Sequence, residues 1–181
     1  MFSMKRCILF FTVLIFVQSA NALTYRAIAN KNWNDPNAWD LSDVPGENDI
    51  VIIDGFTITV PTGTIADAKM VYIQKASVTT EESVLEIRGT LNVTYSLELR
   101  SEYVESPAYP KKIVLKLVDG FVNISGYLKM YREYSDKNTL GMFIDVNENS
   151  ILNVTGNASF IFKGSNLEPT LHSISFKNQS E

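Results

Sequence analysis

Leu85-Glu86-Ile87-Arg88-Gly89-Thr90-Leu91-Asn92-Val93 is the stretch that decides the fold, because two short runs of alternating apolar and polar residues meet there at a single glycine. Alternation with a period of two is typical of a β-strand with one buried face. The same design of strand, glycine and strand recurs at Val51–Ile58, Leu115–Ile124 and Leu152–Phe160. The glycines of the four copies are 34, 31 and 36 residues apart, at Gly55, Gly89, Gly120 and Gly156.

Near-periodic strand pairs predict a stacked architecture, because one copy cannot bury its apolar face alone. We therefore expect an all-β fold, a right-handed parallel β-helix (β-solenoid), in which glycine supplies the positive φ of each sharp corner. The alternative is an antiparallel β-sandwich in which each glycine marks a hairpin. One residue between strands is short for a hairpin and favours the solenoid. We interpret residues 50–162 as the coils and 163–181 as a C-terminal tail containing one more strand, His172–Phe176.

The first 22 residues have the pattern of a secretory signal peptide. Two basic residues precede the apolar run Ile8–Val17, and Ala20-Asn21-Ala22 has the small residues that a signal peptidase reads. The apolar run is too short to span a bilayer comfortably. We expect Leu23 to be the first residue of the mature protein and residues 23–181 to form one domain. The expected location is secreted, extracellular or in the cell envelope, with no membrane insertion after cleavage.

Composition limits the partners and the chemistry of the chain. The full sequence has 16 basic and 20 acidic residues; without the leader, 14 basic residues remain, and the net charge changes from −4 to −6. An acidic surface argues against nucleic acid or an anionic membrane as a partner. The single cysteine, Cys7, lies in the leader, so the mature protein would have no disulfide and no thiolate metal site. His172 is the only histidine, and we predict no catalytic residue.

Residues 23–49 are interpreted as a structural cap at the N-terminal end of the solenoid. Trp33 and Trp39 lie six residues apart on a short loop and can cover the open end of a β-stack. Pro45 begins a turn, and Asp49 can accept backbone N–H groups just before the first core strand.

The pattern W-x5-W followed by V-P-x3-D-x-V-x-I resembles the N-terminal opening of the eight-glycine extracellular β domain and of related secreted β-helix proteins of bacteria. The resemblance implies an extracellular β-helix, of a kind often attached to larger proteins that bind or cleave polysaccharides. The long downstream region that carries chemistry in such proteins has no counterpart after the four copies seen here. We therefore expect a non-enzymatic β-solenoid module with a binding or structural role; the alternative is a compact or truncated polysaccharide-cleaving β-helix enzyme. The residues on the pattern are Trp33, Trp39, Val44, Pro45, Asp49, Val51 and Ile53.

The strand Tyr127–Tyr131 is the candidate ligand-binding surface. Alternation directs Leu128 and Met130 toward the core, and it directs Tyr127, Lys129 and Tyr131 outward. Flat aromatic rings with a polar tip suit sugar rings, which predicts a glycan, or else a cell-surface protein, as the partner. The alternative is the ordinary preference of tyrosine for half-exposed strands.

Residues 32–68 contain seven acidic residues and no Lys or Arg. Loop carboxylates suit Ca²⁺, and Asp35, Asp40 and Asp43 are the candidate ligands. The alternative is that these carboxylates cap turns, and no other cofactor is expected.

Five sequons would be glycosylated if the source is eukaryotic. Three of their asparagines lie beside the repeating glycines, where stacked side chains can instead form a ladder between coils. The five acceptor residues are Asn92, Asn123, Asn153, Asn157 and Asn178.

Overall fold

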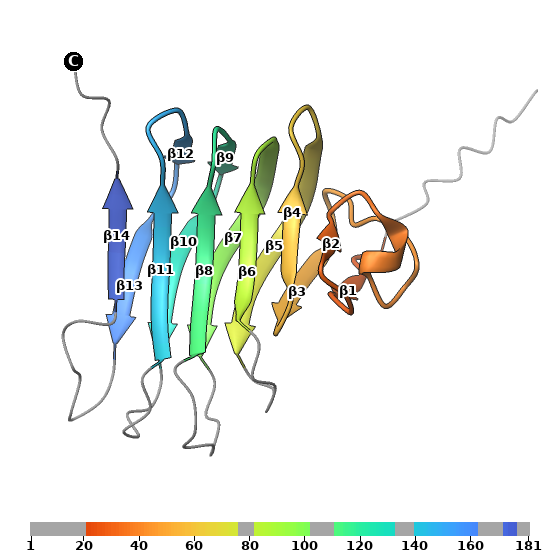
Figure 1. Cartoon of the computed structure of the whole chain (residues 1–181), viewed down its shortest axis with the longest axis horizontal. Helices are drawn as coiled ribbons and strands as arrows, with labels where there is room; N and C mark the ends of the chain where they lie inside the picture. The colour runs from red at the N-terminus through yellow and green to blue at the C-terminus, as the bar shows by residue number, and fades with distance from the viewer. Residues whose placement is uncertain (1–20, 76–81, 102–110, 133–139, 163–171, 177–181) are drawn as a thin grey trace, which may run out of the picture.

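The structure, a computed structural model, describes residues 21–75, 82–101, 111–132, 140–162 and 172–176, so nearly all of the expected leader lies outside it. Within these ranges the strands stack as a β-solenoid of about four turns (Figure 1). The expected β-helix is confirmed. The alternative sandwich is wrong, because all pairings between the described strands are parallel.

Two parallel sheets form the walls of the solenoid, and a short helix lies in the cap. The first sheet contains, in spatial order, β1 (Thr24–Arg26), β3 (Ile50–Asp54), β5 (Ile65–Lys75), β7 (Thr90–Ser101), β10 (Tyr127–Arg132) and β13 (Ala158–Phe162), with β9 (Phe121–Ile124) and β12 (Ile151–Val154) extending from β7. The second sheet contains β2 (Lys31–Asn32), β4 (Thr57–Val60), β6 (Ser83–Ile87), β8 (Lys111–Leu117), β11 (Leu140–Val146) and β14 (His172–Phe176). The 3₁₀ helix is η1 (Pro36–Ala38).

The coil repeat is shorter than the spacing of the glycines. Leu85 pairs with Leu115 and Leu115 pairs with Ile144, which are offsets of 30 and 29 residues. The four glycines gave longer spacings because they occupy different corners, so their alignment as equivalent positions was wrong. Gly55 joins β3 to β4, Gly89 and Gly120 follow β6 and β8, and Gly156 separates β12 from β13.

Glycine is required at these corners for two different reasons. Gly55 has a φ of 77°, as the sequence predicted. Gly89 does not have a positive φ, but a Cβ atom there would overlap the carbonyl oxygens of Pro61 and Thr64 in the preceding coil. Gly120 meets the same restriction one coil later. Close approach of successive backbones therefore replaces positive φ as the reason for glycine at these two corners.

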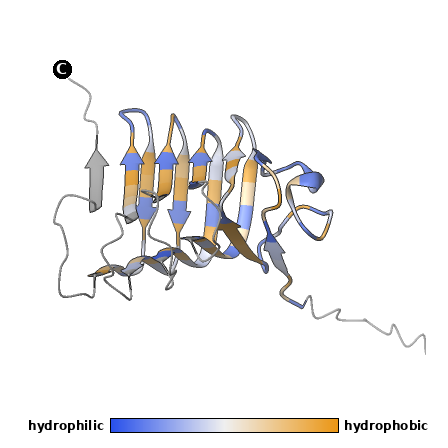
Figure 2. Cartoon of the chain, turned by 60° about the horizontal axis from the view of Figure 1, so that its bottom comes forward, coloured by the Kyte–Doolittle hydropathy of each residue, from blue (hydrophilic) through white to orange (hydrophobic). Residues whose placement is uncertain are grey.

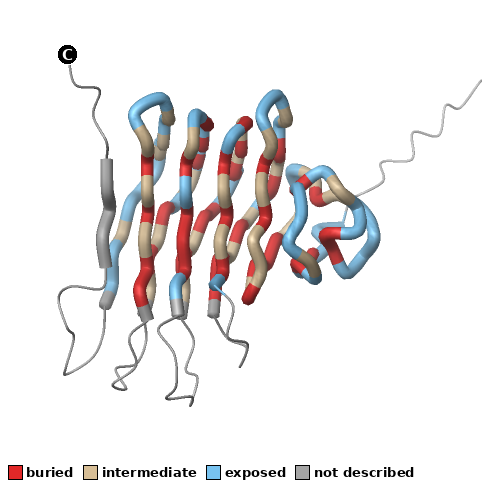
Figure 3. Tube along the Cα trace, viewed as in Figure 1, coloured by how far each residue is buried: buried red, intermediate tan, exposed pale blue. Residues whose placement is uncertain are grey.

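The core lies between the two sheets and consists of aliphatic side chains stacked in rows. Hydropathy and burial both alternate along the strands (Figures 2 and 3). One row, with no exposed surface, contains Ile58, Leu85, Leu115 and Ile144. Fully burying such a side chain contributes about 1.5–3 kcal/mol. Each strand thus needs the coils above and below it.

The last coil lacks this cover on the first sheet. Phe160 is 43 % exposed, whereas Met130 and Leu99, at the same position in the two preceding coils, are at most 1 % exposed. The N-terminal end is covered by the cap, so the two ends of the solenoid differ (Figure 3).

A charged ladder connects neighbouring coils on the outside of the second sheet. Glu86 accepts hydrogen bonds from Arg88 Nε at 2.6 Å and from Lys116 Nζ of the next coil at 3.0 Å. Burial raises the pKa of Glu86, but these two hydrogen bonds outweigh it and hold the pKa below its ordinary value.

We expect Glu86→Gln to lower the melting temperature more at neutral pH than in acid. A carboxylate whose pKa is depressed by folding stabilises the protein above its unfolded-state pKa and loses that effect as the pH falls through the folded-state pKa. The advantage of the wild type should therefore shrink as the pH falls below about 4.3. Thermal unfolding from pH 7 to pH 3 measures this. A difference between the two proteins that does not change with pH would contradict the role assigned to this ladder.

Candidate functional site

The outer face of the first sheet carries the residues that the sequence nominated for ligand binding. In β10, Leu128 and Met130 are buried in the core, at 3 % and 1 % exposure. Tyr127 is 46 % exposed, and Lys129 and Tyr131 are half-buried on the same outer side. The alternation of the strand therefore places the three side chains outward, as expected.

Sequence reasoning missed a second exposed tyrosine on this face. Tyr95 is 50 % exposed and lies where β7 bends, between the part that pairs with β9 and the part that pairs with β10. Its ring meets that of Tyr127 nearly at a right angle, with 5.8 Å between centroids and 78° between planes. We call Tyr95 and Tyr127 the tyrosine pair. Two rings at a right angle can hold one flat ligand by its face on one ring and by its edge on the other.

Glycine at position 126 allows the tyrosine pair to form. A Cβ atom on Gly126 would overlap the backbone carbonyl oxygen of Tyr95. The coil that carries Tyr127 can therefore lie close to the coil below only because this residue has no side chain. The backbone under the pair is fixed by parallel pairing of Tyr127 with Ser96. The Ser96 hydroxyl is fully buried and has no hydrogen-bond partner in the described part of the chain.

Tyr72 is a poor stacking surface, although it also lies on this face. The guanidinium carbon of Arg100 lies 3.8 Å from the centre of the Tyr72 ring. Arg100 Nε donates to Gln74 Oε1 at 2.8 Å, which fixes the cation in that place. Burial, followed by the charge of Glu98, raises the pKa of the Tyr72 phenol, so it stays neutral at physiological pH. One face of this ring is thus already occupied by a cation.

Tyr131 is partly covered in a similar way. Lys129 Nζ lies 5.0 Å from the centre of the Tyr131 ring. Lys129 is also in register with Glu98 on β7, so opposite charges are adjacent on this face. Ammonium and carboxylate groups donate to and accept from sugar hydroxyls, respectively. The face therefore combines one exposed aromatic pair with polar groups beside it.

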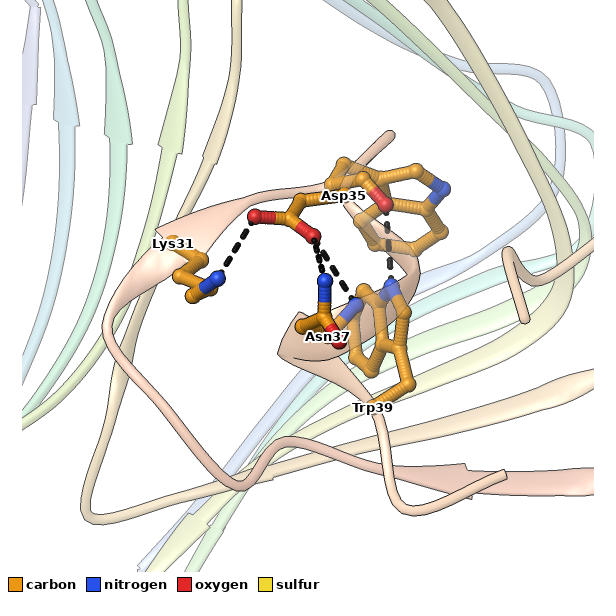
Figure 4. A network of polar contacts seen from close by, with 5 residues as sticks. Lys31, Asp35, Asn37 and Trp39 are labelled. Atoms are coloured by element: carbon orange, nitrogen blue, oxygen red, sulfur yellow. Dashed lines mark hydrogen bonds and ion pairs between the residues drawn. The ribbon is translucent and has the colours of Figure 1, made fainter. Parts of the chain in front are cut away.

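The predicted cap residues are buried rather than presented to solvent. Trp33 and Trp39 are 1 % and 0 % exposed, and their ring centroids are 5.2 Å apart. Trp39 Nε1 donates to the Trp33 carbonyl oxygen at 2.9 Å (Figure 4). Pro45 is buried as well, and Asp49 accepts from backbone N–H groups of Leu23 and of the turn that precedes it. This arrangement supports packing rather than ligand binding.

Asp35, the first candidate Ca²⁺ ligand, caps η1. Its Oδ1 accepts from the Asn37 backbone N–H at 2.9 Å, and its Oδ2 accepts from Lys31 Nζ at 2.8 Å (Figure 4). The hydrogen bond from Lys31, followed by that from the Asn37 backbone, lowers the pKa of Asp35. The carboxylate is therefore already matched with a cation and two donors on its own loop.

Asp40 and Asp43 are also engaged by nearby backbone. Asp40 Oδ1 accepts from the Arg26 N–H at 2.9 Å, and Asp43 Oδ1 accepts from the Val44 N–H at 2.8 Å. Among the described residues, no group of three His, Cys, Asp or Glu side chains is arranged to hold a metal ion. The turn-capping interpretation accounts for all three candidate carboxylates.

Three of the sequon asparagines lie on one row between coils. Asn92 Nδ2 donates to Asp67 Oδ1 at 2.9 Å, and Asn123 Nδ2 donates to Asn92 Oδ1 at 3.0 Å. These bonds form the ladder that the sequence suggested as the alternative to glycosylation. The other predicted acceptors are Asn153, in register with Asn123, Asn157, which is exposed, and Asn178, which lies outside the described residues.

No protein-family model, curated protein or solved structure matches the chain. Within the ranges that the structure covers, no helix has the length and apolarity needed to cross a membrane. The function must therefore be argued from the geometry of the face itself.

Proposed function

We propose that this protein is a secreted, non-enzymatic β-solenoid module that binds carbohydrate on the outer face of the first sheet. The tyrosine pair carries the proposal, because it is the exposed aromatic site that the described face presents on a backbone fixed from both sides. A preorganised site avoids the loss of conformational entropy that a flexible loop incurs on binding. Secretion is supported by the signal-peptide pattern and by the absence of cysteine after residue 7.

The geometry favours recognition of one or two sugar rings. A ring can stack on the exposed side of Tyr127 with its edge against Tyr95, while its hydroxyls reach Lys129 and Glu98. Such a contact area is small, so we expect a dissociation constant between micromolar and millimolar for a single site. Several copies on one surface would raise the apparent affinity by avidity.

Alanine at either member of the pair should weaken binding. We expect Tyr95→Ala and Tyr127→Ala each to raise the dissociation constant about tenfold, which corresponds to about 1.4 kcal/mol of lost binding energy. The effect of Tyr131→Ala should be smaller, because Lys129 already lies over that ring. A glycan array would identify the ligand, and calorimetric titration of the variants would measure the change.

Phe121→Ala is the matched control, because Phe121 is an aromatic residue of similar exposure, 44 %, outside the pair. It should leave the dissociation constant unchanged. Glycan binding that survives both tyrosine substitutions would place the site elsewhere. Robust turnover of a polysaccharide by the purified protein would replace this proposal by the enzyme alternative.

A further inference from the structure

Leu23, the expected first residue of the mature protein, is already held by the cap through its backbone. Its nitrogen lies 2.9 Å from Asp49 Oδ1, and its carbonyl oxygen accepts from the Ile50 N–H at 2.8 Å. Strand β1 begins at the next residue. Ordered structure therefore starts at the position where the sequence predicts cleavage.

Asp49 connects three segments of the chain. Besides the Leu23 nitrogen, its carboxylate accepts from the Gly46 N–H at 2.8 Å. Its backbone carbonyl accepts from the N–H groups of Lys69 and Met70 in the next coil, at 2.8 and 3.2 Å. A change in the strength of the contact between Leu23 and Asp49 is thus transmitted to the cap and to the first coil.

We propose that cleavage after Ala22 completes the N-terminal cap, because the new α-ammonium group of Leu23 forms an ion pair with Asp49. The inference rests on the proposed secretion. Hydrolysis of the bond between Ala22 and Leu23 consumes one water and leaves a carboxylate on Ala22 and an amine on Leu23, which takes up a proton at neutral pH. The donor to Asp49 then changes from an uncharged amide to a cation. Charge-assisted hydrogen bonds are about twice as strong as neutral ones.

The surroundings of the site favour a positive charge at this point. Residues 32–68 contain seven acidic residues and no Lys or Arg. Asp49, Asp43 and Asp40 all act electrostatically on Tyr25 of β1, which places their negative charge near the start of that strand. The other charged groups on the segments that meet at Asp49 are Arg26, Glu47 and Lys69. The ammonium group would offset part of the acidic excess of the cap.

The proposal can be tested by comparing two forms that differ only at the N-terminus. One form begins at Leu23, and the other retains Asn21 and Ala22. At pH 6.5 the form that begins at Leu23 should melt about 2–4 °C higher. The Asp49 carboxylate raises the pKa of the ammonium above its ordinary value of about 8. Such a group stabilises the fold below its unfolded-state pKa and loses the effect as the pH rises through its folded-state pKa, so the difference should vanish in alkaline solution.

Asp49→Asn should abolish the difference between the two forms, and the matched control Glu47→Gln, an exposed acid in the same turn, should preserve it. Equal melting of the two forms at pH 6.5, or an equal difference in Asp49→Asn, would overturn the ion pair while leaving secretion and glycan binding intact. Intact mass of the secreted protein completes the test. A mature chain that begins at another residue would overturn the role of Leu23, and retention of the whole leader would overturn the proposed secretion as well.

Discussion

Replacing Trp39 by alanine is expected to lower the free energy of unfolding by about 3–5 kcal/mol, which is the usual cost of truncating a large buried aromatic side chain. The side chain has no exposed surface and packs edge-on against the rings of Trp33 and Tyr25. The variant also leaves the buried Trp33 carbonyl without the Trp39 Nε1 donor. Denaturant unfolding followed by far-ultraviolet circular dichroism measures the loss without depending on tryptophan fluorescence.

Two phenylalanine variants separate packing from hydrogen bonding at the same place. Trp39→Phe removes the donor to the Trp33 carbonyl, whereas Trp33→Phe removes an indole N–H that is buried and has no partner among the described residues. Trp39→Phe should therefore be the more destabilising of the two. Tyr127→Ala serves as the exposed control and should hardly change stability. Unchanged stability of Trp39→Ala together with loss of glycan binding would make Trp39 a binding residue instead of a cap.

The class of fold could be predicted from the sequence because it follows from local alternation and from repetition. The phase of the repeat could not be predicted, and the tripeptide Asp-Gly-Phe shows why. At residues 54–56 it joins the first sheet to the second, and Gly55 has the positive φ; at residues 119–121 it follows the second sheet, and Asp119 has the positive φ, 57°. Identical local sequences thus serve two corners, and only pairing between coils distinguishes them.

The candidate site was predictable to the same extent. The outward direction of Tyr127 follows from alternation within β10. The contribution of Tyr95 does not, because its contact with Tyr127 depends on the register that joins Ser96 to Tyr127 across 31 residues. The cation over Tyr72 comes likewise from the next coil. A solenoid builds its surface from residues about one coil apart, and such pairs leave no signal in a short window of sequence.

Gly89→Ala should be nearly as damaging as the loss of a core tryptophan, at about 3 kcal/mol, which is the upper end of the usual cost of overpacking. The added methyl group would overlap the backbone carbonyl oxygens of Pro61 and Thr64, and a backbone oxygen cannot rotate away as a side chain can. Relief requires the coils to separate. Separation would weaken the hydrogen bonds that the N–H groups of Arg88 and Gly89 donate to the Val60 carbonyl, at 2.9 and 3.1 Å. Thermal and denaturant unfolding of the variant measure the effect.

Gly46→Ala is the control that isolates this steric argument, because it makes the same chemical change in open surroundings. A Cβ atom there would lie 3.6 Å from Asp49 Oδ2, an ordinary van der Waals distance, and the φ of Gly46 is not positive. Since alanine also restricts the unfolded chain, the variant should be within about 1 kcal/mol of the wild type, with stabilisation as the favoured sign. Equal effects of the two substitutions would mean that chain flexibility, and not the close approach of successive coils, determines where this solenoid needs glycine.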